Sequence, residues 1–282
     1  MTAHIGDSSG DLRDVAATSV LIAALRAREA GQEQPLYRDE PVSHFLDPKS
    51  VAMATNALDR LPEAAEMVAL RTHFFDLAFE ASLRSGIRQF VLLGSGLDTR
   101  AIRFADPERR FYELDRESVL THKKRILKAA RYDLSHIAFL AGDYTDGRLK
   151  AVLTAAGLIS DRPVHFHWEG NSVYVPELAF RRVLHELSDF EPGSRVSLDY
   201  MTRAVIAGRT GHAGIDGYMR ALGESGAPWV TGFDSPEDIT SGLPLQTLEH
   251  AQVSDLQERY RGYREAGFAL LDFYRLLVLE KR

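Results

Sequence analysis

The chain has 282 residues, of which 45% are hydrophobic and 26% charged, the ordinary balance of a globular protein. This length suits one domain with elaborations, and no stretch reaches the roughly 20 apolar residues of a membrane-spanning helix. The net charge of −6 and the lack of cysteine disfavour nucleic-acid binding and exclude disulfides and thiolate metal sites. We therefore expect one cytoplasmic domain over residues 1–282 that acts on a small molecule, with no nucleic-acid or membrane partner.

The first part of the chain is predicted to be helical. Residues 14–30 place apolar side chains at helical spacing and end before Gly31. Residues 62–84 begin with a proline and carry a wide apolar face. Three prolines between these two helices indicate a turn-rich link. We assign residues 1–85 to N-terminal helices.

From residue 86 the pattern changes to strands that alternate with helices, which is typical of a parallel sheet with right-handed crossovers. The predicted strands are 89–93, 110–114, 137–141, 164–168 and 195–200. The predicted helices between them are 98–105, 117–130, 145–156 and 176–189. We assign residues 86–202 to a cofactor-binding core.

Residues 203–244 interrupt this alternation with eight glycines and three prolines. Long irregular segments in compact domains are usually lids or binding loops, so we expect a cap over the site here rather than core. The last part, residues 245–282, is predicted to hold two strands, at 246–251 and 268–279, with a helix between them at 255–263.

One strand breaks into the turn Gly94-Ser95-Gly96, and the next strand ends in Asp115, nineteen positions after Gly96. Bare backbone at such a turn lets a ligand approach, and an acid at the next strand end can accept both hydrogen bonds of a ribose diol. An ordinary tight turn and a helix N-cap are the alternative interpretations. A dinucleotide fingerprint needs a third small residue at position 99, where this chain has Thr99, so NAD is disfavoured.

Two further acids follow strands at the same predicted edge. Asp143 is either a contact for an adenine amino group or a turn residue. Glu169 ends an apolar strand, where a buried carboxylate needs a positive partner such as a cationic ligand. Arg71 lies on the helix before the first strand, where its guanidinium either holds a ligand carboxylate or faces solvent.

His165 and His167 alternate on the fourth strand, so both side chains point to one face. A core position is favoured over a metal site, because no third ligand is evident. His167 lies next to the strand end and is our candidate general base. Tyr200 is a second catalytic candidate, and Asp199 and Tyr174 are predicted to line the site, although each of the three could equally be a packing or capping residue.

Four segments occur in an order that one known family shares: residues 71–76 (RTHFFD), 91–100 (VLLGSGLDTR), 112–115 (YELD, with Lys123 or Lys124 downstream) and 168–174 (WEGNSVY). They resemble the leucine carboxyl methyltransferase-like family, which includes bacterial polyketide O-methyltransferases of the tetracenomycin type. The resemblance runs from about residue 14 to the C-terminus. It implies a class I methyltransferase that uses S-adenosylmethionine.

The implied fold is α/β, a Rossmann-like seven-stranded sheet, mostly parallel with an antiparallel C-terminal hairpin, plus N-terminal helices and a cap. The family pattern implies that Arg71 holds the methionine carboxylate of S-adenosylmethionine, and that Gly94 and Gly96 let the backbone approach it. It also implies that Asp115 binds the ribose and that Asp143 lies near the adenine.

By the same resemblance Glu169 faces the amino-acid part of the cofactor. Asp98, within the glycine motif, and Tyr144, beside the third-strand acid, complete the expected cofactor-binding set. Two positions depart from the family pattern: Glu117 stands where a proline is frequent, and His167 is unusual on its strand.

We therefore expect an S-adenosylmethionine-dependent O-methyltransferase, without a metal, that acts on a carboxyl or hydroxyl group of a small molecule in secondary metabolism. Three alternatives stay open: a protein C-terminal carboxyl methyltransferase, an NAD-dependent oxidoreductase, and a regulatory protein that binds the cofactor without methyl transfer. The sequence makes no prediction of the oligomeric state.

Overall fold

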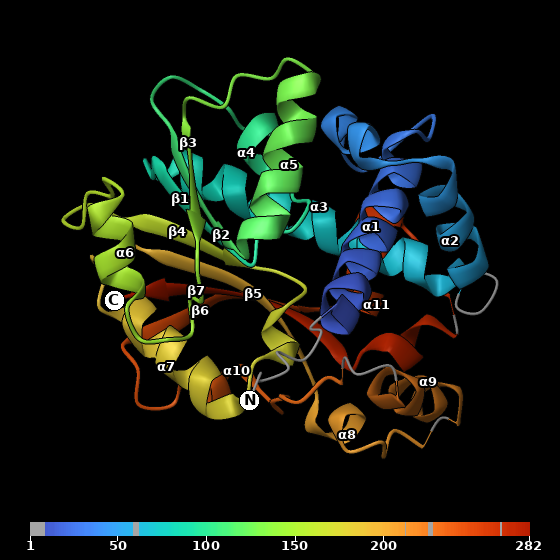
Figure 1. The fold of residues 1–282 in the computed structure, drawn as a ribbon. Coiled ribbons are helices and arrows are strands. Elements are labelled where there is room, and N and C mark those ends of the chain that lie inside the picture. Colours follow the sequence, from blue (N-terminus) through green and yellow to red (C-terminus); the bar gives the residue numbers. More distant parts are fainter. Residues whose placement is uncertain (1–8, 59–61, 212, 225–227, 266) are drawn as a thin grey trace, which may run out of the picture.

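A computed structural model describes residues 9–58, 62–211, 213–224, 228–265 and 267–282. Its strands are β1 Gln89–Leu93, β2 Arg110–Asp115, β3 Ile137–Ala141, β4 Val164–Trp168, β5 Arg195–Met201, β6 Leu245–Gln252 and β7 Tyr274–Lys281. They form one sheet in the order β3-β2-β1-β4-β5-β7-β6, with helices on both faces (Figure 1). Strands β1 to β5 run parallel, and β7 inserts antiparallel between β5 and β6. The predicted sheet with its antiparallel C-terminal hairpin is confirmed.

The N-terminal region contains more helix than predicted. Its helices are α1 Ser9–Ala30, the 3-10 helix η1 Glu40–Phe45, α2 Pro48–Leu58 and α3 Glu63–Arg84. The link predicted as turn-rich thus holds two of them. Pro41 and Pro48 both lie in the first turn of a helix, where the missing N–H removes no hydrogen bond. These prolines begin helices instead of preventing them.

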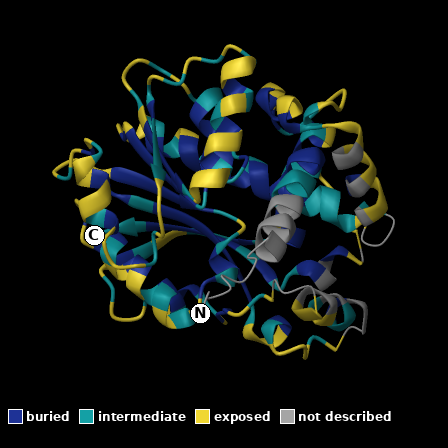
Figure 2. Cartoon of the chain, in the orientation of Figure 1, coloured by how far each residue is buried: buried dark blue, intermediate teal, exposed yellow. Residues whose placement is uncertain are grey.

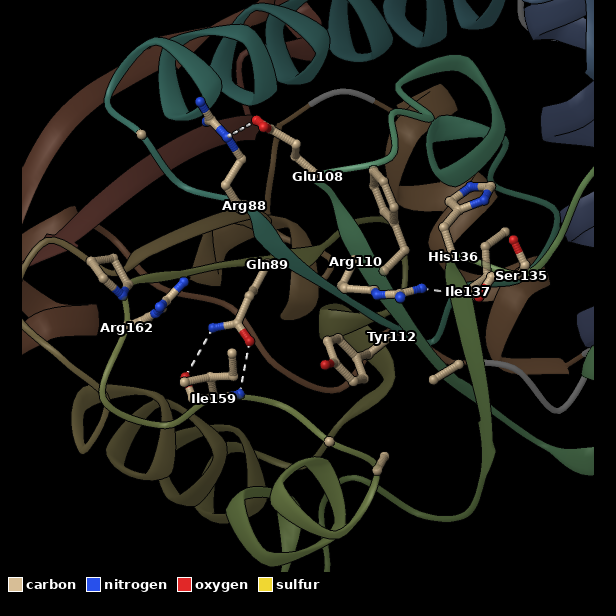
Figure 3. A pocket seen from close by; sticks show the side chains of 16 residues that line it. Arg88, Gln89, Glu108, Arg110, Tyr112, Ser135, His136, Ile137, Ile159 and Arg162 are labelled. Atoms are coloured by element: carbon tan, nitrogen blue, oxygen red, sulfur yellow. Dashed lines mark hydrogen bonds and ion pairs between the residues drawn. The ribbon is translucent and has the colours of Figure 1, made fainter.

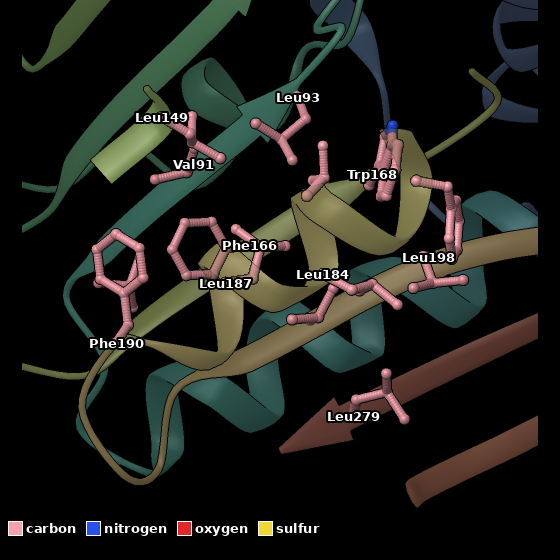
Figure 4. Close-up of a cluster of buried hydrophobic side chains, with 14 of the residues drawn as sticks. Val91, Leu93, Leu149, Phe166, Trp168, Leu184, Leu187, Phe190, Leu198 and Leu279 are labelled. Carbon is pink, nitrogen blue, oxygen red and sulfur yellow. The ribbon is translucent and has the colours of Figure 1, made fainter. Parts of the chain in front are cut away.

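The helices between the parallel strands are α4 Arg100–Arg103, α5 Glu117–Ala129, α6 Leu149–Ala155 and α7 Glu177–Ser188, with a 3-10 turn η2 Ser172–Tyr174 before α7. Helix α7 shows why they pack on the sheet. Phe180, Val183, Leu184 and Leu187 follow the i, i+3, i+4, i+7 spacing and are almost completely buried. Figure 4 shows Leu184 and Leu187 facing side chains of the strands. Each such side chain contributes about 1.5–3 kcal/mol through burial.

Residues 203–244 differ in part from the expected cap. They contain α8 Arg203–Ile206, α9 Ala213–Glu224 and α10 Pro236–Thr240. Phe233 and Ile239, at the end of the segment, are buried in the main core, and the Phe233 ring lies 4.7 Å from that of Phe180. Val205, near the start of the segment, is also fully buried in a second core cluster. The expectation that this segment stays outside the core is therefore wrong at both ends, because glycine content does not reveal where isolated apolar side chains pack.

The chain closes with β6, α11 Val253–Arg261, the 3-10 helix η3 Phe268–Leu271 and β7. The strand predicted over residues 268–279 therefore begins later, at Tyr274. A continuous apolar run does not by itself distinguish a buried strand from a buried turn of helix. In the part of the chain that the structure describes, no helix is long and apolar enough to span a bilayer.

Burial follows the layers of the fold. In Figure 2 the central strands are buried, and the exposed residues lie on loops and on the outer faces of helices such as α5. The edge strands β3 and β6 are only partly buried. All five residues of β4, at the centre of the sheet, are buried. A strand covered on both faces is rich in apolar residues, and in β4 His165 and His167 are the two polar exceptions.

A cavity of about 550 Å³ opens at the amino ends of the first three strands (Figure 3). Arg88, Arg110 and Arg162 lie around it, and the Gln89 carboxamide makes two hydrogen bonds with the backbone of Ile159, of 2.9 and 2.8 Å. None of the predicted site residues lines this cavity. The candidate residues concentrate at the opposite edge of the sheet.

Candidate active site

The carboxyl ends of β2, β1 and β4 lie side by side at one edge of the sheet. After β1 the chain crosses to β2 on one side, whereas β4 lies on the other side. A change of direction of this kind opens a crevice between neighbouring strands, and open α/β sheets bind ligands there. Helix α3 places Arg71 at the same edge, where it contacts Glu169.

The predicted glycine turn and acid are joined directly. Gly94 and Gly96 have φ values of 62° and 45°, which side chains with a Cβ rarely adopt. The backbone N–H of Gly96 donates a 2.7 Å hydrogen bond to Oδ2 of Asp115, and the N–H of Arg116 donates to Oδ1. Asp115 is only partly buried. The carboxylate therefore holds the turn and still lies within reach of a ligand.

The bare face of Gly94 is covered by a residue that the sequence analysis did not single out. A Cβ on Gly94 would lie 2.3 Å from Nδ2 of Asn171. The expectation was that this glycine lets a ligand approach. The structure shows that it first makes room for the Asn171 side chain, so Gly96 is the glycine whose backbone lies beside the carboxylate of Asp115.

Arg71 is buried among acids. Its Nε lies 2.6 Å from Oε1 of Glu169, its Nη1 donates a 2.7 Å hydrogen bond to the Tyr274 hydroxyl, and Nη1 lies 3.7 Å from Oδ2 of Asp199. The Tyr274 hydroxyl in turn donates to Asp199, and the N–H of Gly170 donates to both oxygens of that carboxylate. Burial alone lowers the pKa of Arg71, but its partners Tyr274, Glu169 and Asp199 raise it above the ordinary value.

Arg100 of α4 joins the remaining charges. Its Nη1 donates to Oδ2 of Asp98 at 2.6 Å and to Oε2 of Glu169 at 2.7 Å, and lies 2.9 Å from Nε2 of His167. Its Nε donates to Asp76 of α3 at 2.8 Å. The side chain is only 2% exposed. A buried guanidinium with these partners ties α3, α4 and the end of β4 together.

One nitrogen of this guanidinium occupies a position suited to a cation. Ligand atoms of Asp98, His167 and Glu169 all lie within 4.8 Å of one another, an arrangement compatible with a metal ion. The Nη1 atom of Arg100 lies within 2.9 Å of all three atoms. The guanidinium thus supplies the positive charge at this point. Burial alone raises the pKa of Glu169, but Arg71 and Arg100 hold it well below its ordinary value.

His167 belongs to this charged cluster. Its Nε2 lies 2.9 Å from both Arg100 and Glu169, and its ring meets those of Phe75 and Phe79 edge to face. The side chain is 2% exposed, and Nδ1 has no hydrogen-bond partner among the described residues. In this arrangement the ring holds Glu169 and does not face an open space.

Asp143 and Tyr144 lie after β3. One oxygen of Asp143 accepts from the backbone and the hydroxyl of Thr145, the turn arrangement that the sequence left as an alternative, and its side chain is exposed. The Tyr144 hydroxyl donates to Oδ1 of Asn171 at 2.6 Å and accepts from Nε1 of Trp168. Tyr144 therefore connects the end of β3 to the end of β4.

The structure does not bring Tyr200 to the charged cluster. Neighbouring residues on a strand face opposite sides, so Asp199 meets Arg71 while Tyr200 points to the other face. There its hydroxyl lies 2.9 Å from Nε2 of His250, and burial raises its pKa to about 12. His165 lies in the core, with its ring nitrogens within 2.8 Å of the hydroxyls of Ser82 and Ser197.

Tyr174, on η2, is close enough to the cluster for the charges of Asp199 and Arg71 to influence its pKa, which burial raises. Four residues of the site were not predicted as such: Asp76, Arg100, Asn171 and Tyr274. Asp76, Arg100 and Asn171 stand inside the quoted family segments. A charged residue within an apolar helix face is a signal that could have identified Asp76. No local pattern marks Tyr274, because its partner Arg71 is 203 residues away.

Comparisons with known proteins show which family the chain belongs to. The family model described as leucine carboxyl methyltransferase matches residues 19–188. A Frankia alni protein described as an S-adenosyl-L-methionine-dependent methyltransferase is 31% identical over 257 residues, covering 88% of this chain and 86% of that protein. A Mycobacterium marinum protein with the same description is 34% identical over 214 residues, covering 70% and 68%.

Two solved structures share the fold at low sequence identity. A DUF574 family protein from Streptomyces avermitilis has a TM-score of 0.63 and 16% identity, covering 94% of this chain and 97% of its own. A Thermobifida fusca protein described as a methyltransferase has a TM-score of 0.59 and 17% identity, covering 94% of both chains. The family model spans more than half of the chain, so the chain belongs to the leucine carboxyl methyltransferase family.

Proposed function

We propose that this S-adenosylmethionine-dependent methyltransferase methylates an oxygen atom, in a carboxyl or hydroxyl group, of a small molecule. One observation carries the proposal: the ends of β2, β1 and β4 align Asp115, the glycine turn and the Arg71–Glu169 pair along one edge. A ligand with a ribose at one end and an amino-acid group at the other matches this order of charges.

The donor set fits S-adenosylmethionine. Nη2 of Arg71 has no hydrogen-bond partner among the described residues, so it would hold the methionine carboxylate. Asp115 would bind the ribose hydroxyls, with Asp143 and Tyr144 near the adenine. Both oxygens of Glu169 already meet arginines, so we propose that Glu169 orients Arg71 toward the amino-acid part.

When bound, the cofactor supplies an electrophilic methyl group. The protein would then hold the acceptor oxygen in line with that group and exclude water. A carboxylate acceptor is already a nucleophile, whereas a phenol or alcohol benefits from a base. His167 remains the predicted base, but its contacts with Arg100 and Glu169 favour a positioning role. If His167→Ala leaves turnover unchanged across pH, His167 is not the base.

A compact acceptor is supported by the end of the 203–244 segment. The N–H of Val230 donates to the carbonyl of Val173 at 2.8 Å, and the Thr231 hydroxyl donates to the carbonyl of Val175 at 2.6 Å. These bonds hold the segment against the chain that leaves β4. The resemblance to polyketide O-methyltransferases supports a role in secondary metabolism, and the lack of cysteine is consistent with the cytoplasm.

The test has two stages. Calorimetry with S-adenosylhomocysteine should show binding, whereas NADH titrated in the same way should not bind. Methyl-labelled S-adenosylmethionine is then incubated with panels of small carboxylic acids, phenols and alcohols, and with peptides that carry a free C-terminal carboxylate. Label in the small molecules supports the proposal, and label in the peptides alone contradicts it. A protein that binds the cofactor yet labels nothing in either panel would favour the regulatory alternative.

A further inference from the structure

Both the nitrogen and the oxygen of the Asn171 carboxamide make hydrogen bonds. Its Nδ2 lies 2.9 Å from the carbonyl of Leu93, 3.0 Å from that of Gly94 and 3.2 Å from that of Glu169. Its Oδ1 accepts hydrogen bonds from Nε1 of Trp168 and from the hydroxyl of Tyr144, both at 2.6 Å. An indole N–H only donates, so it determines which end of the carboxamide is oxygen.

These bonds lie where two strands separate. The ladder between β1 and β4 runs from Gln89 with Val164 to Leu92 with His167 and ends there. Beyond that point Nδ2 of Asn171 bonds to carbonyls on both sides of the gap. The gap is the crevice at which the order of the strands changes direction, and such crevices bind ligands. The carboxamide therefore forms the floor of the candidate cofactor site.

Asn171 is also matched to its surroundings in shape. Gly94 leaves no space for a Cβ, because Nδ2 and Cγ of Asn171 would lie 2.3 and 2.6 Å from it. The same side chain meets Tyr144 and the carbonyl of Glu169, two residues predicted to bind the cofactor. One carboxamide thus sets the relative positions of three strand ends that carry the candidate site.

We propose that Asn171 is a positioning residue whose carboxamide determines cofactor affinity by holding the ends of β1, β3 and β4 together. The inference rests on the proposed function, since it assumes that S-adenosylmethionine binds along this edge. The N–H donors of Asn171 Nδ2 hold the strand ends together, and the volume of the side chain is not the cause. An oxygen in place of Nδ2 would face three carbonyl oxygens and push the strand ends apart.

The test compares Asn171→Asp with wild type in calorimetry with S-adenosylhomocysteine, well below the melting temperature of both. The dissociation constant should rise at least tenfold, and in turnover assays KM for S-adenosylmethionine should rise much more than kcat falls. Asn56→Asp is the matched control, because Asn56 is an exposed residue of α2. The control should bind with wild-type affinity.

Asn171→Ala keeps the test decisive if the aspartate variant does not fold. It removes the donors without adding a charge, and its affinity should fall in the same direction. Wild-type affinity in a folded Asn171 variant would overturn the inference, as would tighter binding, which would mean that the carboxamide competes with the ligand for these carbonyls. No binding to the wild type would instead contradict the proposed function, so the two failures are distinguishable.

Discussion

The backbone N–H of Gly96 donates a 2.7 Å hydrogen bond to Oδ2 of Asp115, and so links the turn after β1 to the end of β2. We propose that the same carboxylate binds the ribose, so its loss should affect both the turn and the ligand. We expect Asp115→Ala to weaken S-adenosylhomocysteine binding by about 10–100-fold, equivalent to about 1.5–3 kcal/mol. Calorimetry measures this, with Asp133→Ala as the control, since Asp133 is exposed and holds a local turn. Equal affinity in both variants would contradict the assignment.

Arg71→Lys keeps the charge but loses the planar fork that bonds a carboxylate at two points. We expect its affinity for S-adenosylhomocysteine to fall about tenfold or more, with a smaller effect on the melting temperature, because Glu169 and Asp199 keep a cation nearby. Arg84→Lys, on the exposed face of the same helix, is the matched control. If both lysine variants bind like wild type, Arg71 does not hold the carboxylate.

Gly94→Ala should be more destabilising than Gly86→Ala. Both glycines have positive φ, which costs an alanine about 1–2 kcal/mol. Only Gly94 also faces a side chain, since a Cβ there meets Asn171 at 2.3 Å while a Cβ on Gly86 meets nothing within 4 Å. Urea unfolding should show an additional loss of about 1–3 kcal/mol for Gly94→Ala. In the double variant Gly94→Ala/Asn171→Ala the losses should be less than additive, and strict additivity would argue against the clash.

Arg100→Met should lower the free energy of unfolding by about 3–5 kcal/mol, because it leaves the carboxylates of Asp76, Asp98 and Glu169 buried without their shared guanidinium. Arg148→Met is the control, since that arginine is exposed and, among the described residues, forms an ion pair only with Asp146. Arg148→Met should change the free energy of unfolding by no more than about 0.5 kcal/mol. A urea midpoint for Arg100→Met equal to that of wild type would show that the cluster is not stabilised by this residue.

Acidification should destabilise the wild type more than His165→Gln. Burial holds the pKa of His165 well below 6.5, so the unfolded chain takes up a proton that the folded chain does not. The stability that depends on a neutral His165 is fully present above pH 6.5. It is lost as the pH falls from 6.5 toward the pKa of His165 in the folded state. Between pH 7.5 and 5.5 the wild type should lose about 1 kcal/mol more than the variant. Urea unfolding at both pH values measures the difference, and parallel losses would place His165 in a more polar environment.

Most of the sheet was predictable from local pattern. The strands β1, β3 and β4 agree with the prediction residue for residue, because each is a short, mainly apolar segment bounded by glycine, proline or polar residues. The missed helices η1 and α2 each hold a proline in the first turn, where proline begins a helix and does not end one. The apolar run before β7 contains a 3-10 helix that hydrophobicity alone did not reveal.

Apart from Arg71 on α3, the predicted residues that the structure brings to the candidate site stand at or just after strand ends. Asp115 ends β2 and Glu169 follows β4, and the carboxyl ends of parallel strands share one edge, so the placement of both acids at that edge followed from topology. Tyr200 stands at a strand end as well, yet the alternation along β5 turns it to the other face. Asn171 was missed, because its partners depend on how a loop packs across two strands.

The sequence by itself determined the order of the strands and of the helices between the parallel strands, the glycine turn and the acids at the strand ends, because periodicity and chain punctuation are local properties. The tertiary structure decided which atoms each buried charge meets. Arg71 bonds to a tyrosine 203 residues away, and Arg100 to a glutamate 69 residues away. Such pairs form only when the helices dock on the sheet, so no local pattern encodes them.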